Sequence, residues 1–311
     1  MITARRLAAG AALLAAFGAP AFAQHTHVLI VTGLGGEPQY STEFRQVGNS
    51  VYRTAKSKWG VADSSVIYLA EDPADDPHIS GKSTKEEIQA AILRLAHRAA
   101  PGDVVFVFLL GHGSGEGPDS RVNVPGPDPT AADYAAWMSG FAKQTVVFVN
   151  ASSASGDFIQ VMQGQGRIVV TATKSAFERN ESLFATFFAN GIESGEADAN
   201  KDGRVSVFEA FDYARSETAR SYDTAKKLQT EHSVVSDSTL AHIVAFGGAP
   251  VSNDPKVAAL VAERRALEDQ LAALRARKAQ MDSTAYQTEL ERLLIAIAEK
   301  TEAIRKAGGG Q

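Results

Sequence analysis

The stretch Val104-Val-Phe-Val-Phe-Leu-Leu-Gly-His-Gly113 decides the fold together with a second run, Val146-Val-Phe-Val-Asn-Ala-Ser-Ser-Ala-Ser-Gly156. Each run is short, rich in β-branched and aromatic residues, and closed by small residues, which is typical of a strand buried on both faces. Because a helix-like stretch at 130–141 separates them, the unit predicts two parallel strands joined by a right-handed crossover. Both following loops then lie at the carboxyl edge of the sheet, where sites form in open α/β sheets. We therefore expect His112 to lie beside Ser152 and Ser153.

Three further apolar runs, at 27–32, 65–69 and 167–172, complete the predicted sheet. Helix-like stretches separate the strands, which predicts a three-layer αβα sandwich with a mostly parallel sheet in the flavodoxin-like order 2-1-3-4-5. The predicted helices cover 41–58, 83–99, 130–141, a stretch opening near Phe158, 183–192 and 208–220. Ser83 and Glu86 have the spacing of a capping box for the second of these helices. We interpret the apolar run 240–246 as a last edge strand.

The composition and the N-terminal residues limit the function classes and indicate where the protein is located. The chain has 311 residues, a net charge of −5 and no cysteine, so it offers neither a basic surface for nucleic acid nor any thiol chemistry. Residues 1–23 combine Arg5-Arg6, an apolar run too short to span a bilayer, and the small-residue site Ala21-Phe-Ala23. This pattern is typical of a signal peptide. We expect a mature chain starting at Gln24, periplasmic or secreted, without a membrane span.

The segment Asp198-Ala-Asn-Lys-Asp-Gly-Arg-Val-Ser-Val-Phe-Glu209 has the spacing of a 12-residue EF-hand loop. The predicted Ca²⁺ ligands are the side chains of Asp198, Asn200, Asp202, Ser206 and Glu209 and the carbonyl of Arg204. Glycine stands at the sixth place, as the turn requires. The alternative interpretation is a polar turn in which Ser206 caps the next helix. The sequence has no second loop of this kind, which favours a structural calcium clamp; a calcium-responsive regulator is the other interpretation.

The C-terminal part differs in kind from the α/β domain predicted for 24–246. Residues 247–255 are rich in glycine, proline and polar side chains and mark a linker. Beyond it, Leu260, Leu267, Leu274 and Met281 recur at a spacing of seven, and Leu290, Ile297 and Ile304 repeat it. Over 256–307 we predict a helical hairpin or coiled coil, with one continuous helix as the alternative. We expect its apolar stripes to pack on each other or on their own domain; association with a partner protein or a second copy is the other use.

The residues at the carboxyl edge suit nucleophilic chemistry. An imidazole can take the proton of a neighbouring hydroxyl while the hydroxyl oxygen attacks. Backbone N–H groups of Gly113 and of the serine turn are placed to hold an oxyanion. The sequence assigns no carboxylate to orient His112, and a hydroxyl needs more activation than a thiol.

These strand ends resemble the caspase-like fold shared by caspases, legumains and gingipains, and are most similar to bacterial secreted legumain-like (C13-type) proteins. In that superfamily, the histidine of a His-Gly pair and the cysteine of an Asp-Ala-Cys-x-Ser-Gly turn form the catalytic dyad. The pair His112-Gly113 matches in full, and an ungapped match of residues 151–156 puts Ser153 at the cysteine; a shift of one puts Ser152 there. The resemblance covers about 28–222 and implies a peptide substrate.

The resemblance leaves the specificity open between cleavage after Asn, after Asp, and after Arg or Lys. Glu178 and Arg179, in the loop after the fifth strand, are the candidates for substrate binding. Two functions follow for the whole chain. One is an exported, calcium-binding, non-catalytic or weakly active homologue that binds peptides, which the missing thiol favours, because exchange of cysteine for serine in such a dyad removes most activity. The other is an active serine-type endopeptidase or acyl hydrolase with a Ser153–His112 dyad, which the retained His-Gly pair favours.

Overall fold

The computed structural model describes residues 24–180, 182–201, 203–247 and 255–308. The predicted signal peptide and most of the predicted linker lie outside these ranges. Within them, no helix is both long enough and apolar enough to cross a membrane.

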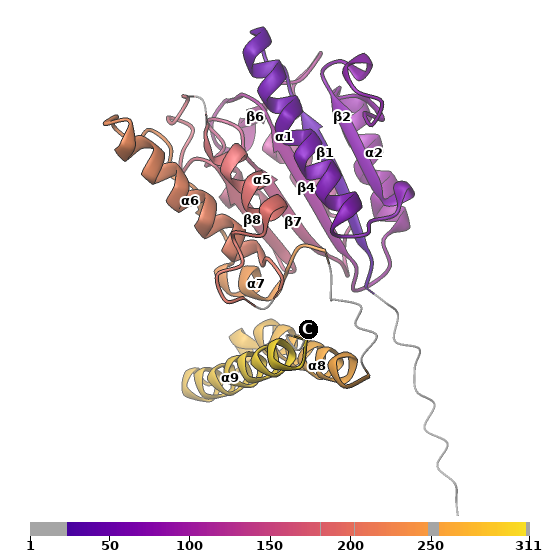
Figure 1. Ribbon diagram of the computed structural model, residues 1–311, viewed down its shortest axis with the longest axis vertical. Coiled ribbons are helices and arrows are strands. Elements are labelled where there is room, and N and C mark those ends of the chain that lie inside the picture. Colours follow the sequence, from indigo (N-terminus) through magenta and orange to yellow (C-terminus); the bar gives the residue numbers. More distant parts are fainter. Residues whose placement is uncertain (1–23, 181, 202, 248–254, 309–311) are drawn as a thin grey trace, which may run out of the picture.

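A mostly parallel sheet forms the centre of the α/β domain (Figure 1). Its strands are β1 (Thr26–Thr32), β2 (Val66–Ala70), β3 (Gly81–Lys82), β4 (Val104–Leu110), β7 (Thr145–Asn150), β8 (Arg167–Thr171) and β9 (Val234–Val235). They run in the order β3-β2-β1-β4-β7-β8-β9, and only β9 is antiparallel to its neighbour. The five long strands therefore have the predicted order 2-1-3-4-5, which confirms the predicted α/β fold.

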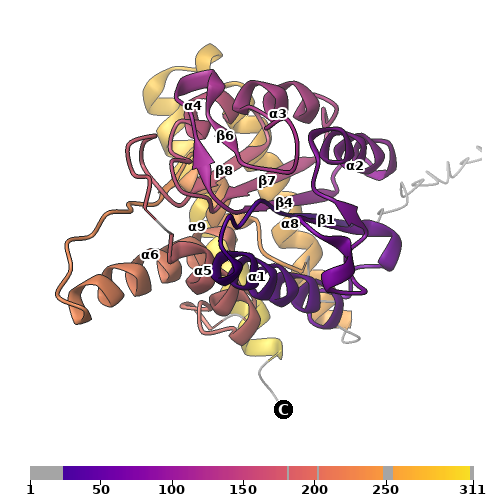
Figure 2. The ribbon, with the colours of Figure 1, turned by 90° about the horizontal axis from the view of Figure 1, so that it is seen from above.

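Helices cover both faces of the sheet, giving three layers (Figure 2). One face carries α1 (Pro38–Ser57), α5 (Phe184–Ser194) and α6 (Val207–Thr224); the other carries α2 (Lys85–Arg98), α3 (Ala131–Met138) and α4 (Phe158–Met162). The strand β4 is buried throughout, and its side chains alternate between the two cores. Phe106 and Phe108 belong to the core under α1 and α5, whereas Val105 and Val107 belong to the core under α2 and α3. The continuous apolar run of β4 follows from this double burial.

Two local predictions are wrong. The run at 240–246 is not a strand: α7 (Ser238–Ile243) occupies most of it, because the side chain of Asp237 caps the helix by accepting a hydrogen bond from the Leu240 amide at 2.8 Å. The edge strand is instead the two-residue β9. The cap of α2 is Thr84, whose hydroxyl accepts from the Glu87 amide, while the Ser83 hydroxyl donates to the Thr32 carbonyl at 2.8 Å.

The C-terminal helices α8 (Pro255–Ala276) and α9 (Ser283–Gly308) form the predicted hairpin rather than one continuous helix. The Asp282 carboxylate accepts from the amides of Thr284 and Ala285, which starts α9 after the turn. The buried residues between the two helices are Leu271, Leu274, Tyr286 and Leu293, and Ile243 of α7 packs against them. The hairpin thus contacts its own domain, at the edge of the sheet where β1 begins and opposite the edge where it ends (Figure 1).

Candidate functional site

The loops after β4 and β7 meet at the carboxyl edge of the sheet, as the sequence predicts. The loop after β4 folds back through β5 (Gly113–Ser114) and β6 (Arg121–Val122), which pair antiparallel. The Asn123 amide donates to the His112 carbonyl at 2.9 Å and holds the start of this loop. Beside it, the Gly113 amide donates a hydrogen bond to the Ser153 hydroxyl oxygen at 3.2 Å. The His-Gly pair and the serine turn are therefore direct neighbours.

Gly113 has to be glycine for this contact to form. A Cβ atom at this position would lie 2.2 Å from the Ser153 carbonyl oxygen and 2.9 Å from the Ser152 hydroxyl oxygen. The backbone of the loop after β4 therefore packs against the turn after β7 with no room for a side chain between them. Ser153 itself is only 3% exposed.

The two serines at the turn have different surroundings. Ser152 is fully buried, and its hydroxyl donates to the Asn150 side-chain oxygen at 2.6 Å, which also accepts the Ser152 amide. That hydroxyl proton is engaged in a local turn. The hydroxyl of Ser153 instead accepts a hydrogen bond from the Gly113 amide, in the loop that carries His112.

The serine turn has a strained backbone that its neighbours hold in place. Ala154 has φ = +52°, in the left-handed region that a side chain disfavours, and its amide donates to the Glu178 carbonyl at 2.7 Å. A Cβ atom on Gly156 would lie 2.1 Å from the carbonyl carbon of Lys174. The loop after β8 thus packs directly on the turn and fixes its shape.

His112 is half-buried, and aromatic rings position its imidazole. The rings of Tyr40 and Phe44, both on α1, meet it edge-on with centroid separations of 4.9 and 5.2 Å. Within the described ranges, no side chain hydrogen bonds to either ring nitrogen, and no carboxylate orients the ring. Neither aromatic residue is among the predicted site residues, although their spacing of four on a helix places them on one face.

The two predicted substrate-binding residues have different roles in the loop after β8. The Glu178 carboxylate accepts from the Lys174 amide and the His232 amide and lies 2.6 Å from His232 Nδ1. Burial alone would raise the pKa of Glu178, but these hydrogen bonds outweigh it and hold the pKa below its usual range. This carboxylate therefore fixes its own loop.

Arg179, in contrast, is exposed to solvent. Its guanidinium lies 3.7 Å from the Glu116 carboxylate, in the loop after β4, and both side chains are more than half exposed. An ion pair of this kind is weak and exchanges readily with solvent or ligand. Arg179 is thus the accessible charge that joins the two loops flanking the serine turn.

The predicted calcium loop joins α5 to α6 at the opposite edge of the sheet. Gly203 has φ = +82°, as the sixth place requires, and its amide donates to the Asp198 carboxylate at 2.9 Å. The Asn200 amide donates to Glu209 at 3.2 Å, so the first and last predicted ligands both fold over the middle of the loop. Asp202 lies outside the described residues.

The alternative interpretation of this loop, a helix cap, also describes part of its geometry. Ser206 and Glu209 form a reciprocal capping box at the start of α6, with the Ser206 hydroxyl 2.8 Å from the Glu209 carboxylate. Three residues separate the end of α5 from Asp198. Over the described residues, no three His, Asp or Glu side chains gather as a metal-binding group. Calcium binding therefore stays a prediction.

Comparisons with known proteins find only distant structural similarity. No protein family and no curated protein matches the chain. Among solved structures, a structural-genomics protein from Geobacter sulfurreducens is 11% identical with a TM-score of 0.44, covering 68% of this chain and 92% of that chain. Caspase-1 from Spodoptera frugiperda is 12% identical with a TM-score of 0.39, covering 68% of this chain and 86% of that chain. The α/β assignment of this chain rests on its own strand order and layers.

Proposed function

We propose that this protein is an exported peptide-binding protein built on a caspase-like scaffold, with little or no hydrolytic activity. One observation carries the proposal. The group at the nucleophile position is the Ser153 hydroxyl, which is almost fully buried and accepts a hydrogen bond from the Gly113 amide. The contact joins the two loops that carry His112 and Ser153, the residues that the caspase-like resemblance aligns with the catalytic dyad.

The surroundings of Ser153 argue against efficient catalysis. A serine hydroxyl is protonated at neutral pH and depends on a well-placed general base. The imidazole of His112 has aromatic neighbours on α1 but no orienting carboxylate among the described residues. The Gly113 amide, a predicted oxyanion donor, already donates to the Ser153 oxygen. Two requirements of a serine mechanism, an oriented general base and a free oxyanion donor, are thus unmet together.

The same edge is well suited to binding. The close approaches at Gly113 and Gly156 and the left-handed Ala154 keep the turn in one conformation, and a preorganised site loses little entropy on binding. The flanking loop after β8 presents the exposed guanidinium of Arg179 and the ring of Phe177, which is 77% exposed. An exposed cation and an exposed apolar ring suit the binding of a peptide.

Calcium binding in the loop 198–209 is part of the proposal. Its support is the fit of the sequence to the EF-hand spacing together with the positive φ of Gly203 and the hydrogen bonds that close the loop over Asp198 and Glu209. The ion would be held by Asp198, Asn200, Asp202, Ser206, Glu209 and the Arg204 carbonyl. Because this loop lies at the opposite edge of the sheet from the serine turn, we expect the ion to take no direct part in peptide binding.

The test is capture of a random peptide mixture on the immobilised mature protein, followed by mass spectrometry of retained and released peptides. We expect a sequence-selected set of intact peptides, with retention weakened by Arg179→Ala and unchanged by the matched exposed variant Arg215→Ala on α6. New peptide termini that disappear in His112→Ala would instead establish the serine peptidase. Retention without sequence preference, unaffected by Arg179→Ala, would refute peptide binding at this edge.

A further inference from the structure

Backbone hydrogen bonds and a ring contact join the predicted calcium loop, residues 198–209, to α7 and the residues that follow it. The Val207 amide donates to the Val244 carbonyl at 2.8 Å, and the Phe246 amide donates to the Val205 carbonyl at 2.9 Å. The Phe208 ring stacks on His242 of α7 with a centroid separation of 3.8 Å. The end of the loop and the end of α7 therefore form one packed unit.

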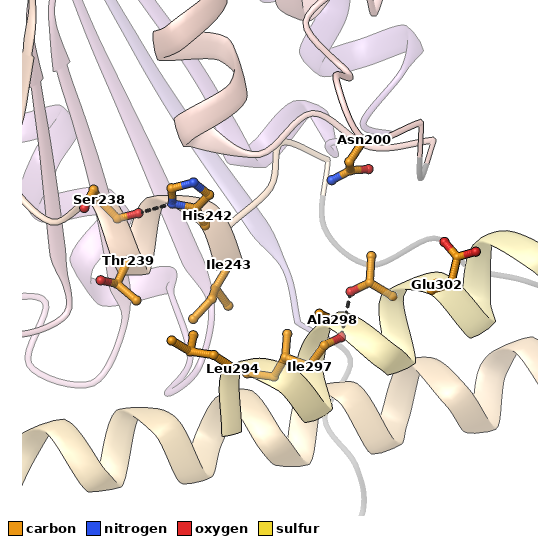
Figure 3. Close-up of a pocket in the computed structure, with 10 residues that line it drawn as sticks. Asn200, Ser238, Thr239, His242, Ile243, Leu294, Ile297, Ala298 and Glu302 are labelled. Carbon is orange, nitrogen blue, oxygen red and sulfur yellow. Dashed lines mark hydrogen bonds between the residues drawn. The ribbon is translucent and has the colours of Figure 1, made fainter. Parts of the chain in front are cut away.

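The same unit contacts the C-terminal hairpin. Ile243 of α7 packs against the apolar core between α8 and α9. A groove of about 600 Å³ runs between α7 and α9, and Asn200 of the calcium loop lies across it from Ile297 and Glu302 (Figure 3). The predicted calcium site and the hairpin are therefore neighbours, on the side of the domain away from Ser153.

Arg264 of α8 is one of the hairpin residues at this contact. Its side chain is only 8% exposed, which is rare for an arginine. It lines a small cavity of about 70 Å³ together with Asn200, Arg204, Ser206 and Glu209, all of them predicted calcium ligands. A buried guanidinium is stable only where negative charge or hydrogen-bond acceptors compensate it. Docking of the hairpin thus brings a positive charge to the loop that would bind a cation.

The charged side chains that line this cavity determine whether calcium binding and docking of the hairpin favour or oppose each other. Among the described residues that line it, Glu209 carries the one carboxylate, whereas Arg204 and Arg264 each carry a guanidinium. A calcium ion in the loop would add two positive charges beside Arg264, in surroundings where screening by water is reduced. Repulsion between the two cations disfavours having both in place.

We propose that Arg264 and Ca²⁺ are alternative cations for the loop 198–209, so that calcium binding and docking of the hairpin oppose each other. The inference rests on the proposed calcium function and gives it a regulatory consequence. Coupling between two such events is reciprocal: calcium loosens the hairpin by the same factor by which the docked hairpin weakens calcium binding. Loosening would uncover the apolar side chains that α7 and α9 now share.

The experiment measures the Ca²⁺ affinity of the full mature chain by calorimetry. Arg264→Met retains the apolar stem and removes the charge, so we expect Ca²⁺ to bind roughly tenfold more tightly, within the range of ordinary coupling factors. The matched control is Arg277→Met, because this exposed arginine lies on the same hairpin about 20 Å further along the axis of α8. The control should leave the affinity unchanged.

A second measurement needs no substitution. Hydrogen exchange of the wild-type chain should become faster in α8 and α9 when Ca²⁺ is added, and this increase should shrink in Arg264→Met. Slower exchange in the hairpin on addition of Ca²⁺ would overturn the inference.

The outcomes separate the two claims. If the wild type binds Ca²⁺ and Arg264→Met binds it equally or more weakly, the opposition is refuted and the calcium site stands. If Arg264→Met binds Ca²⁺ and the wild type does not, the docked hairpin excludes the ion completely, which supports the opposition. If neither chain binds Ca²⁺, the calcium function falls and the inference with it.

Discussion

The Gly113 amide and the Ser153 hydroxyl oxygen are hydrogen bonded at 3.2 Å, which joins the loop after β4 to the turn after β7. Residues 40 positions apart in the chain meet here because two parallel strands end side by side. The contact links the fold to the function that we propose, since Ser153 is the residue that the resemblance to caspase-like proteins aligns with their catalytic cysteine.

The close approach at Gly113 makes this position intolerant of any side chain. In Gly113→Ala the new methyl group would fall 2.2 Å from the Ser153 carbonyl oxygen, so we expect the free energy of unfolding to drop by about 3 kcal/mol. Urea denaturation measures the loss. The control is Gly164→Ala, where the nearest heavy atom would lie 3.9 Å away. Equal stabilities of the two variants would contradict the packing described for the site.

Acid should destabilise the protein through Asp103, at the amino ends of β1 and β4. Burial alone would raise the pKa of Asp103, but hydrogen bonds from the His25 amide, the His27 ring and the Ala100 amide lower it below the ordinary 3.8. A depressed carboxyl pKa stabilises the folded state above the unfolded value and loses that contribution as the pH falls through the folded value. The free energy of unfolding should therefore decline as the pH falls below about 4.

The variant Asp103→Asn tests this assignment. It should cost about 2 kcal/mol at pH 7 and flatten the acid limb of the stability profile. Asp63→Asn is the control, because the pKa of Asp63 is also lowered, through its hydrogen bond from Lys56, but its side chain is 89% exposed. An acid limb that is as steep in Asp103→Asn as in the wild type would show that another group is responsible.

Calcium binding should depend on Glu209. Glu209→Gln removes the charge of the closing ligand, so we expect the Ca²⁺ affinity measured by calorimetry to fall at least tenfold. The control is Glu217→Gln on the same helix, where the carboxylate instead pairs with Arg220. Both variants should keep the helical circular dichroism of the wild type. Identical affinities in the two variants would remove the calcium site from the account.

The order of the central strands could be predicted because β4 and β7 are buried on both faces and their apolar runs leave no other interpretation. The edge strand next to β8 could not be predicted, because β9 has only two residues. A short apolar run such as 240–246 suits a strand or a buried helix equally. The cap residue Asp237, three positions before Leu240, was the signal that identifies α7 as a helix.

At the site, too, the contacts that follow from strand order could be predicted, and those between residues distant in the sequence could not. The meeting of the loop after β4 with the serine turn after β7 follows from strand topology and was predicted. The aromatic contacts of His112 come from Tyr40 and Phe44, some 70 positions earlier on another element, and no local pattern specifies them. The hydrogen bond between Glu178 and His232 spans 54 positions, so the sequence could not tell that this carboxylate fixes its loop.

The central claim is that the carboxyl edge is a peptide-binding cradle whose Ser153 hydroxyl is not an effective nucleophile. The measurement that tests it most directly is cleavage of a mixed peptide library by the mature wild type and by Ser153→Cys. We predict no cleavage by the wild type and cleavage at defined residues by Ser153→Cys. The activity of Ser153→Cys should fall about 10²- to 10⁴-fold when His112→Ala is added, because the general base is lost, and should survive Ser152→Ala. Wild-type cleavage that both Ser153→Ala and His112→Ala abolish would contradict the claim and establish a serine peptidase.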